Sequence, residues 1–199
     1  VKSRLENING KNEKRMKKQD IEKNIHWDHY GIGYIDLPLP LFDKVIPFEL
    51  FVENEANPKI SDKMFATVQD VLNLKPDSIK EIKELLWEEC NFSFTVANYG
   101  CRPKDGETVK AAHFREFGIN DLHDAFEKSS VKGIQIHCDS DKLEGRYAEI
   151  KMETATDNLI SIVVKNGKVI DYDEDGTYLG GFESDEQNAH NNRERVLNQ

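Results

Sequence analysis

The sequence predicts an α+β domain, in which an N-terminal hairpin and a C-terminal meander form an antiparallel sheet packed against a helical pair. Two observations support this fold class. Four segments of about eight residues with alternating apolar side chains follow one another late in the chain, which is typical of a meander. Two segments with helical periodicity lie before them. Separate groups of strands and helices are typical of α+β domains.

The first strands are expected between residues 25 and 53. Aromatic and β-branched residues surround Gly31 and Gly33, which predicts two short strands joined by a tight bend. Pro38 excludes a central strand directly after them. A further strand is predicted over residues 45–53, where apolar side chains alternate again. Its inward-facing candidates are Val45, Phe48, Leu50 and Val52.

The middle of the chain carries the helix signals. Ser61 is suited to cap a first helix, and Asp77 or Ser78 a second one. We expect the second helix to give way to an extended segment over residues 91–99, where aromatic and polar residues alternate. Residues 100–118 are expected to form a loop with at most one short element.

The last part of the chain predicts a short helix starting at Asn120 or Asp121, and then the meander. The dipeptide Asn166-Gly167 is a strong signal for a two-residue hairpin, because both positions of a type I′ turn need positive φ. The four expected strands cover residues 131–138, 146–154, 159–166 and 168–174.

Length and charge predict the domain organisation. The 199 residues suit one domain with flanking segments. Residues 1–24 hold 8 basic and 4 acidic side chains and are expected to form a basic arm, either flexible or a frayed helix. Residues 25–182 are expected to form the single α+β domain, and residues 183–199 a polar tail.

The predicted domain is strongly acidic. It holds 17 basic and 29 acidic side chains, and the whole chain has a net charge of −10. An acidic body repels phosphate backbones, so nucleic-acid binding is disfavoured. The same charge attracts a basic protein and accelerates its association at low salt.

Cysteine use and hydropathy predict a cytoplasmic protein. The three cysteines form no CxxC pair, so we expect reduced thiols rather than a disulfide framework or a zinc site. No apolar run is long enough to span a bilayer, and the first residues lack the apolar stretch of a secretory signal.

One metal-binding alternative stays open. Asp171, Asp173, Asp175 and Gly176 form a DxDxDG string, and carboxylates at alternate positions suit Ca²⁺. The last position of a calcium loop needs glutamate, but Phe182 stands there, and a strand rather than a helix is expected before the string. We therefore predict no metal and no cofactor, with Ca²⁺ binding as the alternative.

Motifs of catalysis are missing from the sequence. There is no GxSxG segment, and the histidines His26 and His29 have no HExxH-type spacing that would support zinc. The sequence therefore predicts a protein that is not an enzyme. A hydrolase without a recognisable motif remains a further alternative.

Three segments carry a resemblance to a known family. The aromatic strands of residues 25–53, the helical pair of residues 61–90 and the closing hairpin of residues 158–180 resemble immunity proteins of polymorphic-toxin and contact-dependent inhibition systems. Residues 152–158 differ, because such domains often carry an acidic run with histidine and glycine there. The resemblance covers residues 25–180. It implies a bacterial cytoplasmic protein that binds and neutralises a cognate toxin, and it supplies no catalytic residues.

Charge and resemblance together predict how a partner binds. We expect an acidic face to occlude the basic active site of a nuclease-type toxin stoichiometrically, with aromatic anchors inside the patch. The predicted partner-binding residues lie in two loops and beside them: Asp139, Asp141, Glu144, Tyr147, Asp171, Tyr172, Asp173, Glu174, Asp175 and Tyr178.

Overall fold

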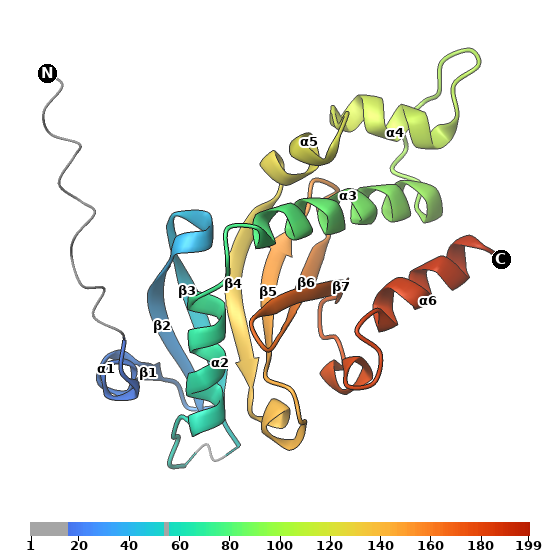
Figure 1. The fold of residues 1–199 in the computed structure, drawn as a ribbon. Helices are drawn as coiled ribbons and strands as arrows, with labels where there is room; N and C mark the ends of the chain where they lie inside the picture. The colour runs from blue at the N-terminus through green and yellow to red at the C-terminus, as the bar shows by residue number, and fades with distance from the viewer. Residues whose placement is uncertain (1–15, 54–55) are drawn as a thin grey trace, which may run out of the picture.

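A computed structural model describes residues 16–53 and 56–199, and it contains one seven-stranded sheet. The strands lie side by side in chain order, as Figure 1 shows. All neighbours are antiparallel except β3 and β4, which are parallel. The predicted α+β class is confirmed. The strands are β1 (His26–Trp27), β2 (Ile32–Leu39), β3 (Lys44–Phe51), β4 (Ser130–His137), β5 (Tyr147–Glu153), β6 (Leu159–Lys165) and β7 (Lys168–Glu174).

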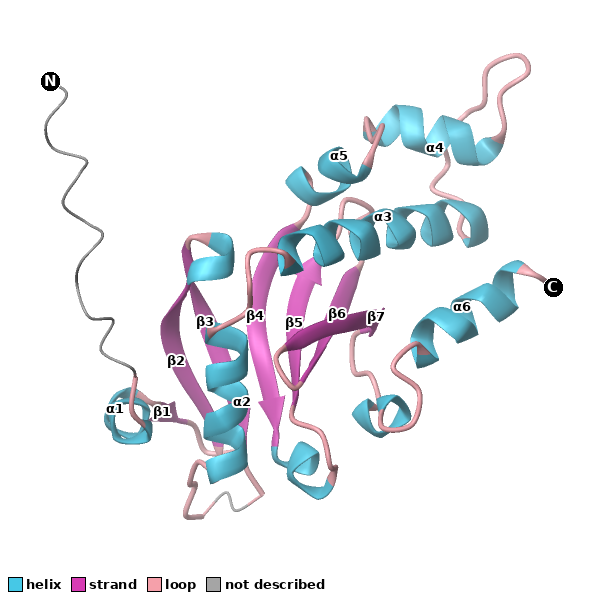
Figure 2. Cartoon of the chain, in the orientation of Figure 1, coloured by secondary structure: helices cyan, strands magenta, loops and turns pink. Residues whose placement is uncertain are grey.

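The helices fall into three groups along the chain. Four of them make the crossover between β3 and β4: α2 (Asp62–Leu72), α3 (Ser78–Val96), α4 (Val109–Phe117) and α5 (Leu122–Glu127). Helices α2 and α3 lie across one face of the sheet (Figure 2). The ends of the chain form α1 (Lys18–Asn24) and α6 (Asn188–Leu197). Short 3₁₀ turns are η1 (Pro40–Phe42), η2 (Cys138–Lys142) and η3 (Leu179–Phe182).

The N-terminal hairpin forms as predicted, but its strand β2 continues past Pro38. The short strand β1 pairs only with Gly33 and Tyr34, so the rest of β2 is an edge. A proline without an N–H group is tolerated on such an edge. In β3, Ile46 rather than Val45 is the first residue that faces the core. Ile46, Phe48 and Leu50 stand at every second position and are all buried, whereas Val45 is exposed.

Helix α3 is longer than predicted, and the expected extended segment at residues 91–99 is wrong up to Val96. The aromatic residues there are helical because Phe94 is buried in a ring cluster, with its centroid 4.9 Å from that of Phe114 and 5.5 Å from that of Tyr99. Ser61 accepts a hydrogen bond from the Met64 amide at 2.9 Å and caps α2, as predicted.

The segment after α3 is a loop with one short helix, which agrees with the expectation for residues 100–118. Thr108 accepts a hydrogen bond from the Ala111 amide at 3.1 Å and starts α4. Asp121 caps α5 through the amides of His123 and Asp124, at 2.8 and 3.0 Å, which confirms that predicted helix start.

The meander and its hairpin are confirmed. Asn166 and Gly167 join β6 to β7, and both have positive φ, at 51° and 74°. The strand alternation places Ala148, Ile150 and Met152 of β5 toward the helices, where they join the main core.

Both chain ends contribute more structure than the sequence predicted. At the N-terminal end, Ile21 of α1 is buried in the main core. At the C-terminal end, α6 buries Ala189 and Arg193, so the expectation of a loose tail after residue 182 is wrong. The polar composition of residues 183–199 did not indicate this helix, because only one face of α6 is buried and the other side chains meet water. Residues 1–15 of the predicted arm lie outside the described residues. Within the described ranges, no helix has the length and apolar character needed to cross a membrane.

Candidate partner-binding cleft

A row of polar side chains lies on the sheet face opposite α2 and α3. Strand alternation turns Glu149 and Lys151 of β5 to this face. Ser161 of β6 pairs in register with Lys151, and Gln135 of β4 pairs in register with Glu149. A second apolar cluster on the same face covers part of it: Tyr147, Val163, Leu179, Phe182 and Ala189. The turn η3 and helix α6 thereby enclose groups that an open sheet would expose.

Lys151 is the centre of a closed network of charges. Its Nζ donates to Glu149 Oε2 at 2.6 Å, to Ser161 Oγ at 2.7 Å and to Asp175 Oδ1 at 2.8 Å. Ser161 Oγ in turn donates to the same Glu149 oxygen at 2.6 Å. Lys151 is 5% exposed and Glu149 is 2% exposed. Buried charges are tolerated when they are paired and hydrogen-bonded in this way.

His137 extends the network toward solvent. Its Nε2 lies 3.5 Å from Glu149 Oε1, and its ring stacks on Phe51 with centroids 4.2 Å apart. Burial lowers the pKa of His137, although the neighbouring Glu149 carboxylate acts in the opposite direction. The imidazole is therefore neutral near neutral pH.

His137, Glu149 and Lys151 line the floor of a cleft of about 570 Å³, which we call the acidic cleft. One wall is η2 with Asp139 and Lys142, together with Leu143 directly after it. The opposite wall is the segment from Asp175 to Gly180. Tyr178 stands on this second wall and is 81% exposed. Tyrosine is one of the residue types that are enriched in binding hot spots.

The structure brings together only some of the predicted partner-binding residues. Asp139, Asp175 and Tyr178 line the acidic cleft, although they come from two different loops. Glu144 is exposed close by, and its amide donates to Glu183 Oε2 at 3.2 Å.

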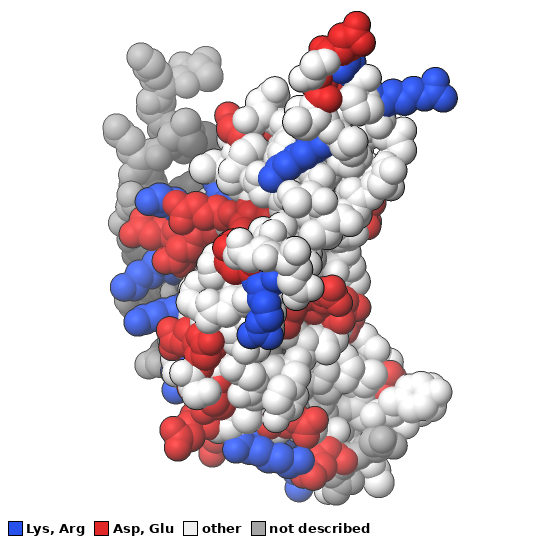
Figure 3. Space-filling model, turned by 90° about the vertical axis from the view of Figure 1, so that its right-hand side faces the viewer, with Lys and Arg blue, Asp and Glu red and all other residues white. Residues whose placement is uncertain are grey.

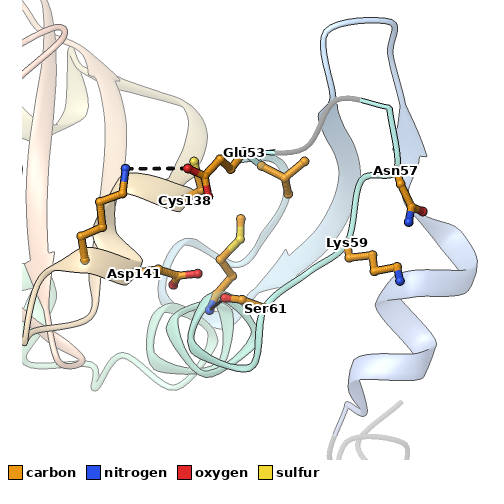
Figure 4. Close-up of a pocket in the computed structure, with 9 residues that line it drawn as sticks. Glu53, Asn57, Lys59, Ser61, Cys138 and Asp141 are labelled. Atoms are coloured by element: carbon orange, nitrogen blue, oxygen red, sulfur yellow. Dashed lines mark hydrogen bonds and ion pairs between the residues drawn. The ribbon is translucent and has the colours of Figure 1, made fainter.

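Three other predicted residues lie around neighbouring cavities. Asp141 lines a separate cavity next to Cys138 and near Ser61 at the start of α2 (Figure 4). Asp173 and Glu174 border a cavity between α3 and α6. These three side chains therefore do not join Asp139 and Tyr178 in one cleft.

For three residues the prediction of a partner contact is wrong, because they are buried. Tyr147 is covered by Leu179 and Phe182. Asp171 accepts a hydrogen bond from Arg193 Nη2 at 2.7 Å. The guanidinium of Arg193 covers the ring of Tyr172, and its central carbon lies 3.6 Å from the centroid of that ring.

The carboxylates of the DxDxDG string do not converge. Asp171 binds Arg193, Asp175 binds Lys151, and Asp173 accepts a hydrogen bond from Thr177. In the part of the chain that the structure describes, no group of three or more His, Cys, Asp or Glu side chains is placed to hold a metal ion. The string is the end of β7 and the turn after it, which explains its spacing without Ca²⁺.

The network also limits what chemistry the cleft can perform. Ser161 is fully buried, and its hydroxyl hydrogen is donated to Glu149, so it is not presented to a substrate in the cleft. Beside the cleft, burial raises the pKa of the Cys138 thiol, and Asp139 adds to this shift, which disfavours the reactive thiolate.

Sequence reasoning missed Glu149, Lys151 and Ser161. Their alternation with apolar residues is the pattern of side chains facing water. Only the apolar residues of the segment after β7 hint that this second face is covered, since Leu179 and Phe182 need a surface on which to pack.

The charge of the surface agrees with the acidic composition. On the side shown in Figure 3, acidic side chains occur over most of the height of the molecule, with basic ones between them. Comparisons with protein-family models, with curated proteins and with solved structures found no match for this chain.

Proposed function

We propose that the protein binds a basic protein partner at the acidic cleft. The observation that carries the proposal is that two acidic loops from distant parts of the sequence line one cleft, with Tyr178 exposed at its rim. Glu149 on the floor and Asp175 on one wall share the cation of Lys151, which leaves one negative charge, while Lys142 pairs with Asp139 on the other wall. A lysine or arginine side chain of a partner would find acceptors on the rim and an aromatic surface beside them.

We further propose that this partner is a bacterial toxin and that the protein acts in the cytoplasm as its immunity protein. The support is the resemblance of residues 25–180 together with the net charge of −10, which suits a nuclease whose active site is basic. Occlusion needs no catalytic group. The enclosed Ser161 hydroxyl is consistent with a binding rather than a catalytic role.

The experiment compares two variants that each lose one negative charge and one exposed tyrosine. Asp139→Asn with Tyr178→Ala alters the rim of the cleft. Glu81→Gln with Tyr30→Ala removes one carboxylate and one exposed tyrosine elsewhere. Tagged proteins are used to recover partners from lysate of the source cells, and a recovered protein is then expressed with and without the wild type.

We expect to recover one basic protein in a ratio near one-to-one. This protein should arrest growth when it is expressed by itself, but not when the wild-type chain that carries the acidic cleft is expressed with it. The cleft variant should bind it at least tenfold more weakly, because hot-spot residues contribute about 2 kcal/mol or more. The control variant should bind as the wild type does. Equal binding by both variants would exclude the acidic cleft, and a partner that does not arrest growth would exclude the immunity role.

A further inference from the structure

A second cavity lies between the C-terminal half of α3, helix α6 and strands β6 and β7. It has a volume of about 600 Å³, and we call it the α3–α6 cavity. Among the residues that the structure describes, Asp175 alone lines both this cavity and the acidic cleft. Size and lining are typical of sites for small organic molecules. Its larger apolar side chains are Phe92, Val96, Leu159, Ile160 and Val196.

Glu89 gives this cavity an uncompensated negative charge. Its Oε1 accepts hydrogen bonds from Ser93 Oγ and Thr156 Oγ1, both at 2.7 Å, and from Asn158 Nδ2 at 2.8 Å. Its Oε2 is buried, and no N–H or O–H group within the described ranges donates to it. Glu89 is 2% exposed, and it forms no ion pair with any lysine, arginine or histidine that the structure describes. A buried carboxylate without a cation is costly.

The neighbouring cation does not neutralise Glu89. Arg193 also lines the cavity, but its N–H groups donate to Glu88, Asp171 and the Tyr172 carbonyl. The Cys90 thiol is close to the carboxylate, and its pKa is raised to about 12 by burial and then by Glu89. A thiol is only a weak donor, so it does not balance the charge.

A second unpaired group lines the same cavity. The Tyr172 hydroxyl is buried and has no hydrogen-bond partner in the described part of the chain. Burial raises the pKa of Tyr172, and the carboxylates of Glu88 and Glu89 add to this shift against the opposite effect of Arg193. Glu89 and Tyr172 therefore line one cavity, and one polar atom of each, Glu89 Oε2 and the Tyr172 hydroxyl oxygen, is buried without a hydrogen bond from the described residues.

We propose that the α3–α6 cavity binds a small organic cation, a primary amine with an apolar body. The ammonium group donates to Glu89 Oε2 and to the Tyr172 hydroxyl, and the apolar body packs on Phe92 and Leu159. An ammonium carries three donors and one positive charge, which are the groups that the site lacks. This site is independent of the partner proposed for the acidic cleft.

Benzylamine and benzyl alcohol are suitable probes, because they have the same ring and differ in charge. Titrations are followed by the NMR signal of the Asn158 side-chain amide, which contacts Glu89. We expect saturable binding of benzylamine in the millimolar range and at least tenfold weaker binding of benzyl alcohol. Glu89→Gln should weaken benzylamine binding at least tenfold, as for a hydrogen bond to a charged group.

The control is Glu84→Gln, which removes an exposed carboxylate from the same helix and should leave the affinity unchanged. Val196→Trp narrows the cavity from an exposed position of α6 and should weaken binding without loss of the fold. Three results would overturn the proposal: no saturable binding, equal affinity for both probes, or equal weakening by Glu84→Gln and Glu89→Gln. The last would mean general attraction of amines to an acidic protein.

Discussion

Substitution of Lys151 by methionine tests the closed network beneath the acidic cleft. Methionine keeps most of the apolar stem but removes the ammonium that binds Glu149, Ser161 and Asp175. Asp175 is half-exposed and regains water, so it contributes little to the cost. Glu149 is left buried with a single close donor, the Ser161 hydroxyl.

The expected loss follows from this geometry. Breaking a buried pair by removing one partner costs about 3–5 kcal/mol, because an uncompensated charge remains. Glu149→Gln alone should cost less, since Lys151 keeps Asp175 as a counter-ion. The double variant Glu149→Gln/Lys151→Met carries no buried charge at these positions and should lose only about 1–2 kcal/mol.

Urea unfolding measures these differences through the midpoint at a constant slope. The order of stability should be wild type, then the double variant, with Lys151→Met least stable. The reasoning is refuted if the costs of the two single variants simply add in the double variant. It is equally refuted if Lys151→Met loses less than about 1 kcal/mol, the range of an exposed ion pair.

Two further predictions concern α6 and α4. Arg193→Gln should lower the free energy of unfolding by about 3 kcal/mol, since Asp171 stays buried without its cation. Hydrogen exchange should show that α6 opens faster in this variant than in Arg193→Lys, which keeps the charge. Hydrogen bonds from the Arg115 guanidinium lower the pKa of Glu107 to about 2. This pair therefore makes its full contribution to the free energy of unfolding above the ordinary glutamate pKa, and the contribution is lost as pH falls through about 2. An NMR titration should find this low midpoint and its return to the ordinary range in Arg115→Leu; an unchanged midpoint in the variant would contradict the assignment.

Local signals explain which parts of the fold were predictable. Asn166-Gly167, Ser61 and Asp121 act within a few residues, and each forms the turn or cap that its chemistry predicts. Residues 91–96 have an ambiguous pattern that fits a strand as well as a helix. The burial of Phe94 among aromatic rings from α4 decided the outcome, and sequence periodicity does not contain that tertiary contact.

The candidate sites were harder to predict for a related reason. The acidity of the two loops could be seen in the sequence, but the buried state of Tyr147, Asp171 and Tyr172 depends on η3 and α6 lying against the sheet. Glu89 is one of many carboxylates in α3. Only its place among Ser93, Thr156 and Asn158 distinguishes it.

The parallel pairing of β3 with β4 has a consequence for folding. Glu49 and Gln135 are joined across this pair by a hydrogen bond although they are 86 residues apart. Contacts of such long range form late, because the chain must lose the entropy of closing a large loop first. During synthesis β3 therefore remains an unpaired edge until the whole crossover and β4 have been made. Lys44 is charged and Pro47 has no N–H group to donate, and both are exposed along this strand, which reduces the risk of pairing with another chain during that time.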